Sequence, residues 1–392
     1  VLTLEPWRCS SGVAFSMRVG ANEIGRKFVP DPCKATKLVP RGSQTSQTSQ
    51  TKKPNRDLIM KLIIPMAGRG TRVRPHSHTT PKPLLPVAGT MIIERIVETF
   101  ARTLDRKIEE IVFILGPDFG RDIREALTEM SARHDAKATF GVQETALGTA
   151  HAVACAGDSL EGEVIIVFAD TLFDTAEAVS VEGADSVIWL KEVEDPSRFG
   201  VAVHEGDVIK GFVEKPSEPI SNLAIIGVYY FKEGRELMKE IQYLIDNDIT
   251  GHGREYQLTD ALDRLIKNGK LFKIATVDEW LDCGTLPAWL DTTTQVLEKE
   301  NHRFHSYEDT TIHPPVYIGE GVEIAGSTIG PHVSIEDGAS IRDSVVRTSI
   351  VQEGAVVVSS TLDKSTVGAR AEVVHMTGEV HVGDDSRVTG RV

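Results

Sequence analysis

The sequence has no long hydrophobic run. No stretch of about 18 or more apolar residues occurs in the chain, so we expect neither a membrane-spanning helix nor a membrane partner. Hydrophobic residues nevertheless make up 41% of the 392 residues, which is enough for substantial cores. A chain of this length is expected to form two or three domains rather than one.

Cysteine is also scarce. The four cysteines are Cys9, Cys33, Cys155 and Cys283. They form neither a Cys-x-x-Cys pair nor a Cys/His spacing typical of a metal site. This pattern argues against a disulfide scaffold and favours a reduced, cytoplasmic protein.

Positive charge is in short supply outside the N-terminal segment. The formal net charge is -14, yet residues 1–59 contain ten Lys and Arg against four Asp and Glu, a net +6, which leaves -20 for the rest. Nucleic-acid binding requires a basic surface, so we expect no nucleic-acid partner. An acidic protein can still bind a nucleotide where a few Lys and Arg side chains converge.

Residues 1–59 show no sustained helix or strand periodicity. Leu38–Ser43 reads LVPRGS, which resembles a thrombin cleavage site, and a polar low-complexity tract, QTSQTSQT, follows it. We interpret the segment as a tag, a linker or a disordered extension that is foreign to the fold. A targeting peptide is the alternative, because the segment is basic, but it lacks the apolar stretch of a secretory signal.

Residues 60–300 alternate between two kinds of segment. Short apolar, β-rich runs such as KLIIPMA, EEIVFILG and EVIIVFAD alternate with amphipathic helical stretches at 90–104 and 254–269. Continuous apolar strands separated by helices predict an α/β domain with a Rossmann-like, mixed but mostly parallel sheet that is covered on both faces. The first strand leads into a glycine-containing loop, so we expect the ligand at the carboxyl ends of the strands.

The pattern changes after a predicted linker at 301–314. In residues 315–392, Ile, Val and Leu recur every five or six positions, with interleaved glycines as in YIGEGVEIAGSTIG. A period near six residues is typical of a parallel β-helix, with about 18 residues per coil and therefore about four coils. A β-sandwich of short strands is the alternative.

The segment 68–87, GRGTRVRPHSHTTPKPLLPV, is the most distinctive part of the sequence. Gly68 and Gly70 allow the backbone to approach a phosphate without a Cβ in the way. Arg69 and Lys82 supply positive charge for a polyphosphate. The segment lacks the Gly-Lys-Ser/Thr ending of a Walker A loop, and it does not match the GxGxxG pattern of dinucleotide-binding folds.

This segment resembles the signature G-x-G-T-R-[LV]-x-P…K-P-[LM]-[LV]-P-V of the sugar-phosphate nucleotidylyltransferase family. Further motifs follow in the family's order over about residues 60–300: VQETALGTAHAV, VFADTLF, RFGVAV, GFVEKPSEP, NLAIIGVYYF and EWLDCGT. The residues of these motifs are most similar to those of glucose-1-phosphate thymidylyltransferases. The resemblance implies a nucleotidyltransferase domain followed by the left-handed β-helix of the longer family members.

The resemblance also implies the reaction: a sugar-1-phosphate oxygen attacks the α-phosphorus of an NTP, and pyrophosphate is released. Such chemistry needs positioning, charge neutralisation and Mg²⁺ rather than covalent participation. Arg69 would grip the departing phosphates, and Lys82 would neutralise charge in the transition state. Asp170, which ends an apolar strand, and Asp282 would hold Mg²⁺. Lys215 would meet the sugar phosphate.

Other positions match the family's substrate-binding motifs. Gln143 offers a donor and an acceptor that can pair with the imide edge of a pyrimidine, and Glu214 would accept hydrogen bonds from sugar hydroxyls. The expected nucleotide-binding residues are Ala67, Gly68, Gly70, Thr71, Gln143 and Gly148. The expected sugar-binding residues are Gly200, Glu214, Lys215, Asn222 and Gly227.

The motifs leave the substrates open. The bases of dTTP and UTP differ by one methyl group, worth only about 1–3 kcal/mol of discrimination. A UTP-dependent glucose- or N-acetylglucosamine-1-phosphate uridylyltransferase is therefore the alternative to a glucose-1-phosphate thymidylyltransferase. A non-catalytic regulatory subunit with the same fold is a further alternative. Acyl transfer by the β-helix is not favoured because the β-helix is short, and we expect its coils to mediate homo-oligomer contacts or regulation.

Overall fold

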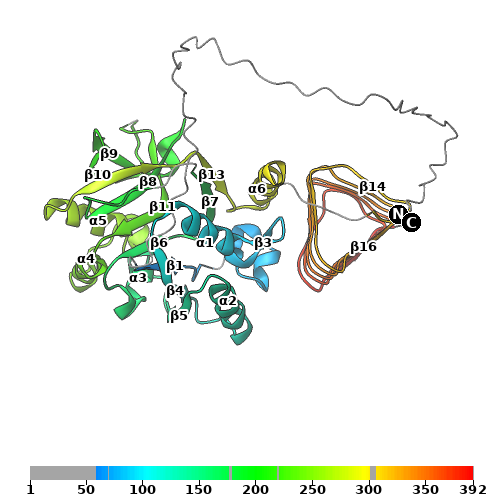
Figure 1. Cartoon of the computed structure of the whole chain (residues 1–392), viewed down its shortest axis with the longest axis horizontal. Helices are drawn as coiled ribbons and strands as arrows, with labels where there is room; N and C mark the ends of the chain where they lie inside the picture. Colours follow the sequence, from blue (N-terminus) through cyan, green and yellow to red (C-terminus); the bar gives the residue numbers. More distant parts are fainter. Residues whose placement is uncertain (1–58, 69, 176–178, 219, 301–305, 392) are drawn as a thin grey trace, which may run out of the picture. The chain divides into compact units, whose positions relative to one another are not determined.

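The computed structural model describes residues 59–68, 70–175, 179–218, 220–300 and 306–391, which form an α/β domain and a β-helix (Figure 1). The expectation for residues 1–59 lies outside these ranges, except that Ile59 begins the first strand. In the described ranges, no helix is long and apolar enough to cross a membrane.

One half of the central sheet is parallel. Strands β5, β4, β1 and β6 lie side by side in that order, and each pairs with its neighbour in parallel. Strand β1 is apolar at almost every position, as a strand covered on both faces must be. The bounds are β1 Ile59–Pro65, β4 Lys107–Leu115, β5 Lys137–Val142 and β6 Val164–Val167.

Helices cover both faces of this sheet, as the alternating pattern predicted. In β1, Leu62 and Ile64 pack in one core with residues of α1, α2 and α6. Ile63 points the other way and packs with residues of α3, α4 and α5. The bounds are α1 Ile92–Thr103, α2 Arg121–Arg133, α3 Thr149–Ala154, α4 Gly234–Asp246, α5 Leu258–Lys267 and α6 Leu286–Lys299.

The other half of the sheet is mixed. From β6 the order continues β11-β8-β12-β10-β9; β11 is antiparallel to both β6 and β8, whereas β8 and β12 are parallel. The share of antiparallel pairs is larger than "mostly parallel" suggests, because a buried antiparallel strand such as β11 is as continuously apolar as a buried parallel one. The bounds are β8 Ser186–Glu192, β9 Gly200–Glu205, β10 Val208–Glu214, β11 Leu223–Phe231 and β12 Phe272–Thr276.

Two helices begin later than their amphipathic patterns indicated. The expected helix at 90–104 begins at Ile92, because Thr90–Met91 forms strand β3 of a hairpin with β2, Pro86–Val87. The expected helix at 254–269 begins only at Leu258. Glu255, Tyr256 and Gln257 are therefore loop residues, and some of them line the cavity described below.

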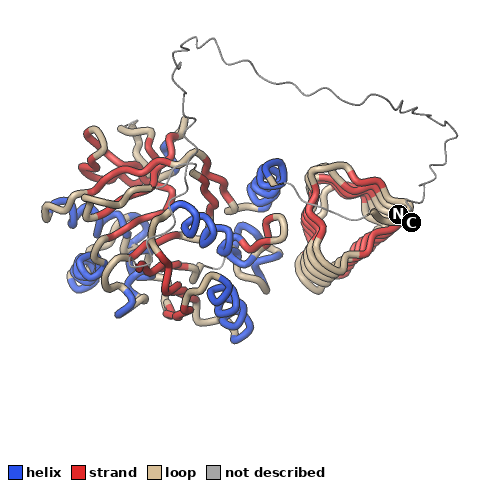
Figure 2. Tube along the Cα trace, in the orientation of Figure 1, coloured by secondary structure: helices blue, strands red, loops and turns tan. Residues whose placement is uncertain are grey.

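The C-terminal residues form coils stacked into three parallel sheets with a triangular cross-section (Figure 2), the architecture of a left-handed β-helix. Each sheet contains five strands. A coil advances by 17 residues from Val316 to Val333 and by 16 from Val333 to Ser349, slightly fewer than the expected 18. The first strand, β14, lies inside the segment 301–314 that we predicted as a linker.

The strand bounds in the β-helix are β14 Thr311–Ile312, β15 Val316–Ile318, β16 Glu323–Ala325, β17 Thr328–Ile329, β18 Val333–Ile335, β19 Ser340–Arg342, β20 Val345–Arg347, β21 Ser349–Val351, β22 Val356–Val358, β23 Thr361–Asp363, β24 Thr366–Val367, β25 Glu372–Val374, β26 Thr377–Gly378, β27 His381–Val382 and β28 Arg387–Thr389. Buried apolar residues from most of these strands, such as Ile341 and Val357, build the core of the coils.

A buried carboxylate, Glu336, connects the β-helix to the β2–β3 hairpin. Its side chain accepts hydrogen bonds from the Ser334 hydroxyl at 2.7 Å and from the backbone amide of Gly89. The ring of Tyr317 packs so closely on Gly89 that a Cβ there would overlap it. Burial raises the pKa of Glu336 to about 7.

Glu336 gives the fold a pH dependence of known sign. Its folded pKa lies above the ordinary value of 4.5, so its contribution to stability is fully present below about pH 4.5 and is lost as the pH rises to about 7. The loss is on the order of 3 kcal/mol. Glu336→Gln keeps an acceptor for both donors and cannot ionise.

We therefore expect Glu336→Gln to match the wild type near pH 5 and to be the more stable protein above pH 7. Urea unfolding of both proteins across this range measures the difference. A difference that stays constant with pH would show that Glu336 is ionised in the folded state throughout.

Candidate active site

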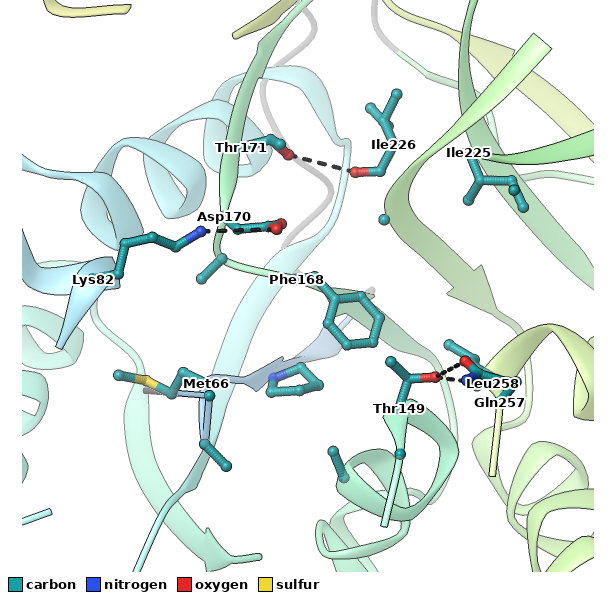
Figure 3. A pocket seen from close by; sticks show the side chains of 18 of the residues that line it. Met66, Lys82, Thr149, Phe168, Asp170, Thr171, Ile225, Ile226, Gln257 and Leu258 are labelled. Carbon is teal, nitrogen blue, oxygen red and sulfur yellow. Dashed lines mark hydrogen bonds and ion pairs between the residues drawn. The ribbon is translucent and has the colours of Figure 1, made fainter. Parts of the chain in front are cut away.

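A cavity of about 930 Å³ opens where β1, β5 and β6 end, which is the edge predicted for a ligand. Figure 3 shows Lys82 pointing toward Asp170 in one part of the cavity and Thr149 close to Gln257 in another. Twelve of the predicted site residues line the cavity: Ala67, Gly68, Gly70, Thr71, Lys82, Gln143, Gly148, Asp170, Gly200, Glu214, Gly227 and Asp282.

Gly70 shapes the loop that follows β1. It has a φ of +58°, and a Cβ at this position would lie 3.0 Å from the Cβ of Lys82. Both the left-handed conformation and the close approach favour glycine. The Ser77 hydroxyl donates a hydrogen bond of 2.7 Å to the Gly70 carbonyl. Arg69, the residue predicted to grip the departing phosphates, lies outside the described residues.

Lys82 and Asp170 form an ion pair inside the cavity. Their Nζ and Oδ2 atoms are 3.8 Å apart. The Lys82 side chain, in a short 3-10 helix (η3, Lys82–Leu84), is only 10% exposed, whereas that of Asp170 is 47% exposed. The carboxylate is therefore neutralised on one side and open to a ligand on the other.

A two-stranded sheet brings the second aspartate to the first. Strand β7, Thr171–Asp174, begins directly after Asp170, and β13, Glu279–Asp282, ends at Asp282. The two strands are antiparallel, with Asp282 opposite Thr171. Two carboxylates more than 100 residues apart in sequence thus come together at one end of this small sheet.

Backbone hydrogen bonds hold the two aspartates in place. The Cys283 amide donates to the carbonyl of Asp170 at 3.1 Å, and the Gly284 amide donates to the Asp282 carboxylate at 2.7 Å. In the described residues, no group of three or more His, Cys, Asp and Glu side chains could hold a metal ion. Two carboxylates suit Mg²⁺ when substrate phosphates and waters complete its oxygen ligands.

Cys283 lies beside this pair but is not suited to be a nucleophile. The side chain is fully buried, and burial raises the pKa of the thiol to about 12. The thiol therefore stays neutral at physiological pH, and only the thiolate is a strong nucleophile.

Gln143, behind the end of β5, has its side-chain amide held by two acceptors. The amide nitrogen donates to the carbonyl of Gly148 at 3.2 Å and to Nδ1 of His151 at 3.1 Å. Both N–H groups are thereby engaged, which leaves the side-chain carbonyl oxygen to accept a hydrogen bond from a ligand. The hydrogen bond to His151 thus fixes the orientation of the Gln143 side-chain amide.

Gly148 brings a second loop against the cavity. It has a φ of +118°, and a Cβ there would lie 2.5 Å from the Tyr256 carbonyl oxygen. The Tyr256 amide donates to the Leu147 carbonyl at 2.8 Å. This contact places Glu255 and Gln257 at the cavity wall.

Sequence reasoning missed these wall residues. Glu255 and Gln257 fell inside an apparent helix, and Thr149 and Trp280 are embedded in motifs quoted for other positions. The glycines that precede them, Gly251 and Gly253, were the available sign that a loop rather than a helix starts here.

Gly200 and Glu214 form a matched pair across β9 and β10. A Cβ at position 200 would lie 2.8 Å from the Glu214 carboxylate, so glycine makes room for that side chain. Gly227 has a φ of +83° at an irregularity in the β11 register, and its carbonyl accepts the Phe168 amide at 3.0 Å. Tyr229, also at the cavity, has a raised pKa because it is buried and faces carboxylates.

Lys215 and Asn222 are described by the structure but do not line the cavity. Lys215 adopts a φ of +46°, and its amide donates to the Phe199 carbonyl at 3.0 Å. The Asn222 side chain donates to Glu192 at 2.6 Å. A role of either side chain in sugar binding stays a prediction.

A family model described as Nucleotidyl transferase matches residues 61–299. The low-salt glycan biosynthesis nucleotidyltransferase Agl11 of Haloferax volcanii is 31% identical over 365 residues, which cover 84% of this chain and 99% of that protein. A glucose-1-phosphate thymidylyltransferase of Streptomyces griseus is 27% identical, with the same coverage.

Two further proteins share only part of their length or only the fold. The bifunctional protein GlmU of Methanococcus aeolicus is 31% identical over 271 residues, and this chain spans 62% of its length. A crystal structure of UDP-glucose pyrophosphorylase with UDP-glucose superposes with a TM-score of 0.50 at 24% identity, over 62% of this chain and all of that one. The matched range covers almost the whole α/β domain and all residues that line its cavity, and the chain therefore belongs to the nucleotidyl transferase family.

Proposed function

We propose that the chain transfers a nucleotidyl group from dTTP or UTP to a sugar-1-phosphate, with glucose-1-phosphate as the first candidate. The observation that carries this proposal is the Lys82–Asp170 pair with Asp282 beside it, inside a cavity that the glycine loop also lines. The products are an NDP-sugar and pyrophosphate.

The geometry favours direct transfer without a covalent enzyme intermediate. An oxygen of the sugar phosphate forms a bond to the α-phosphorus, and the bond from that phosphorus to the β-phosphate oxygen breaks. Lys82 is placed to offset negative charge on the phosphates, and the backbone around Gly70 is open to them. Arg69 belongs to the same phosphate-binding proposal by its position in the sequence.

Asp170 and Asp282 are the residues that would hold Mg²⁺. When bound, the ion would supply Lewis-acid stabilisation of the phosphate oxygens. The half-exposed carboxylate of Asp170 and the backbone-anchored carboxylate of Asp282 fit an oxygen-only ligand set.

The base is proposed to contact Gln143 and Gly148. With its nitrogen engaged, the Gln143 side chain has its oxygen left to accept the N3–H of thymine or uracil, whereas cytosine offers an acceptor at that position. This hydrogen bond favours a base with an imide N–H, and it does not distinguish thymine from uracil, which lacks the methyl group. Both UTP and dTTP are therefore proposed as nucleotide substrates.

On the sugar side, we propose that Glu214 accepts hydrogen bonds from hydroxyls. The absence of a side chain at Gly200 and Gly227 lets a sugar ring approach the strands beside the carboxylate. A uridylyltransferase acting on glucose- or N-acetylglucosamine-1-phosphate is the second candidate, because the contacts of Gln143 suit uracil as well as thymine.

A matrix of NTPs against sugar-1-phosphates, read out as pyrophosphate release, tests the proposal. We expect release with glucose-1-phosphate and dTTP or UTP, and little with CTP or purine nucleotides. Release confined to UTP with N-acetylglucosamine-1-phosphate would favour the second candidate. No pyrophosphate release with any pair of substrates at saturating Mg²⁺ would favour a non-catalytic regulatory subunit.

The proposed metal ligands predict a steep loss of activity. Asp170→Asn and Asp282→Asn each remove one anionic oxygen ligand, and we expect kcat to fall by about 100-fold or more while folding survives. Asp174→Asn is the matched control, because Asp174 ends β7, the strand that directly follows Asp170, and pairs with the exposed Arg102 outside the cavity. Near-normal turnover of either test variant would show that the substituted aspartate is not a metal ligand.

The sugar-side assignment predicts a selective effect on KM. Glu214→Gln weakens acceptance of sugar hydroxyls, so the KM for the sugar phosphate should rise about tenfold with the KM for the NTP unchanged. Glu205→Gln, at the exposed far end of β9, serves as the control. Lys215→Ala, assayed in parallel, tests whether that side chain reaches the sugar phosphate. A rise in the NTP KM alone would mean that the two sides are exchanged.

A further inference from the structure

We propose that the β-helix positions the phosphate-binding segment: side chains of the coils hold His76, and through it the backbone that presents Gly70 and Lys82 to the nucleotide. His76 is then a positioning residue, and the β-helix belongs to the catalytic unit. The expected effect on kinetics rests on the proposed function. The expected ordering of the segment rests on the contacts alone.

His76 is the centre of the contact. It lies in the short helix η2, His76–His78, inside the signature segment 68–87, and is completely buried. Nε2 is 2.7 Å from the Thr366 hydroxyl, and Nδ1 is 2.8 Å from the side-chain amide of Gln352. The imidazole also packs edge-on against Trp289, with ring centroids 5.3 Å apart.

The hydrogen bonds form a chain with a single direction. The Gln352 amide donates to Nδ1 of His76, so the proton of His76 is on Nε2 and is donated to Thr366. The Thr366 hydroxyl can then donate to Nδ1 of His381 at 2.9 Å, and Nε2 of His381 donates to Glu379 at 3.0 Å. Burial lowers the pKa of His76 to about 4, which keeps the imidazole neutral, as this arrangement requires.

Further contacts fasten the segment near His76. The hydroxyls of Thr79 and Thr80 both donate to the carboxylate of Asp384, at 2.5 and 3.3 Å. A Cβ at Gly383 would lie 3.1 Å from the Cβ of Pro75, so the coil and the loop are in close contact there as well.

The chain is fastened to the coils again on the other side of Lys82. Gly89 packs on Tyr317 and donates its amide to Glu336. Lys82 thus lies between two attachment points on the β-helix, at His76 and Gly89.

The attachment leads directly to the phosphate-binding backbone. Ser77, next to His76, donates its hydroxyl to the Gly70 carbonyl at 2.7 Å, and Gly70 in turn packs against Lys82. A contact needed only for adhesion between two domains could be apolar. A directional chain of buried polar groups instead specifies one orientation, because any shift leaves a buried donor or acceptor unpaired.

Two substitutions on the coils test the proposal without altering the cavity. Thr366→Val removes the hydroxyl but keeps the β-branched shape, and Gln352→Leu removes the amide donor. Ser360→Ala is the matched control: Ser360 is a buried coil residue that donates to the Val358 carbonyl and accepts the Met376 amide, within the β-helix alone. Thr366→Ser restores the hydroxyl and should restore function.

The first readout, amide hydrogen exchange of peptides covering residues 70–84, is independent of activity. We expect exchange to rise about tenfold in Thr366→Val and Gln352→Leu, the size expected from loss of one buried hydrogen bond, and to stay at the wild-type level in Ser360→Ala and Thr366→Ser. Exchange of residues 70–84 that is equal in the test and control variants overturns the proposal.

The second readout is the kinetics of pyrophosphate release. Thr366→Val should lower kcat/KM for the NTP about tenfold and leave the KM for the sugar phosphate unchanged, with a melting temperature close to that of Ser360→Ala. Equal losses for both substrates, or a loss that follows the melting temperature, would indicate a purely structural contact. If no pair of substrates reacts with the wild type, the proposed function fails, and the exchange measurement still decides whether the coils hold the segment.

Discussion

The parallel pairing of β1 with β6 is the constraint on which the site depends. Ile63 lies opposite Ile166, so both strands end at the same edge of the sheet. The loop after β1 and the turn that contains Asp170 are therefore brought together by the pairing of these two strands. Lys82, Asp282 and Gln143 are then placed relative to this edge, by the loop after β1, by the β7–β13 pair and by the end of β5 respectively. A change in this register would separate the cation of Lys82 from the carboxylate of Asp170.

The charge of the cavity raises a physical problem for a nucleotide site. Asp170, Glu214, Glu255 and Asp282 line it, against Lys82 and Arg72 among the described lining residues. A triphosphate entering this field would be repelled unless cations were added. Asp170 and Asp282 would hold a divalent ion, whose charge would offset the two carboxylates and attract phosphate oxygens. The metal proposal thus follows from the charge balance as well as from the positions of the two aspartates.

The sequence predicted the part of the site that is carried by local motifs. Strand ends, the Gly70 loop, Asp170 and Asp282 could be located because each is embedded in a contiguous pattern with its own physical reason. Lys215 belongs to such a motif as well, but it does not line the cavity, and its contact with the sugar phosphate stays a prediction. Glu255 and Gln257 were missed because an amphipathic pattern extends over a loop ahead of the helix. The share of antiparallel strands was underestimated because burial makes both kinds of strand uniformly apolar.

The contact between His76 and the coils shows where sequence patterns stop being informative. Its partners, Gln352 and Thr366, are almost 300 residues away and occupy ordinary positions of a coil repeat. Nothing in the hexapeptide pattern distinguishes Thr366 from other polar coil residues, because the pattern records only which side chains face the core. In the folded chain, however, that hydroxyl meets the neutral, fully buried imidazole of His76, in the short helix that precedes the one containing Lys82. A β-helix that served only as a spacer would need no directional contact with this histidine, whereas such a contact is expected of coils that hold the segment carrying Gly70 and Lys82.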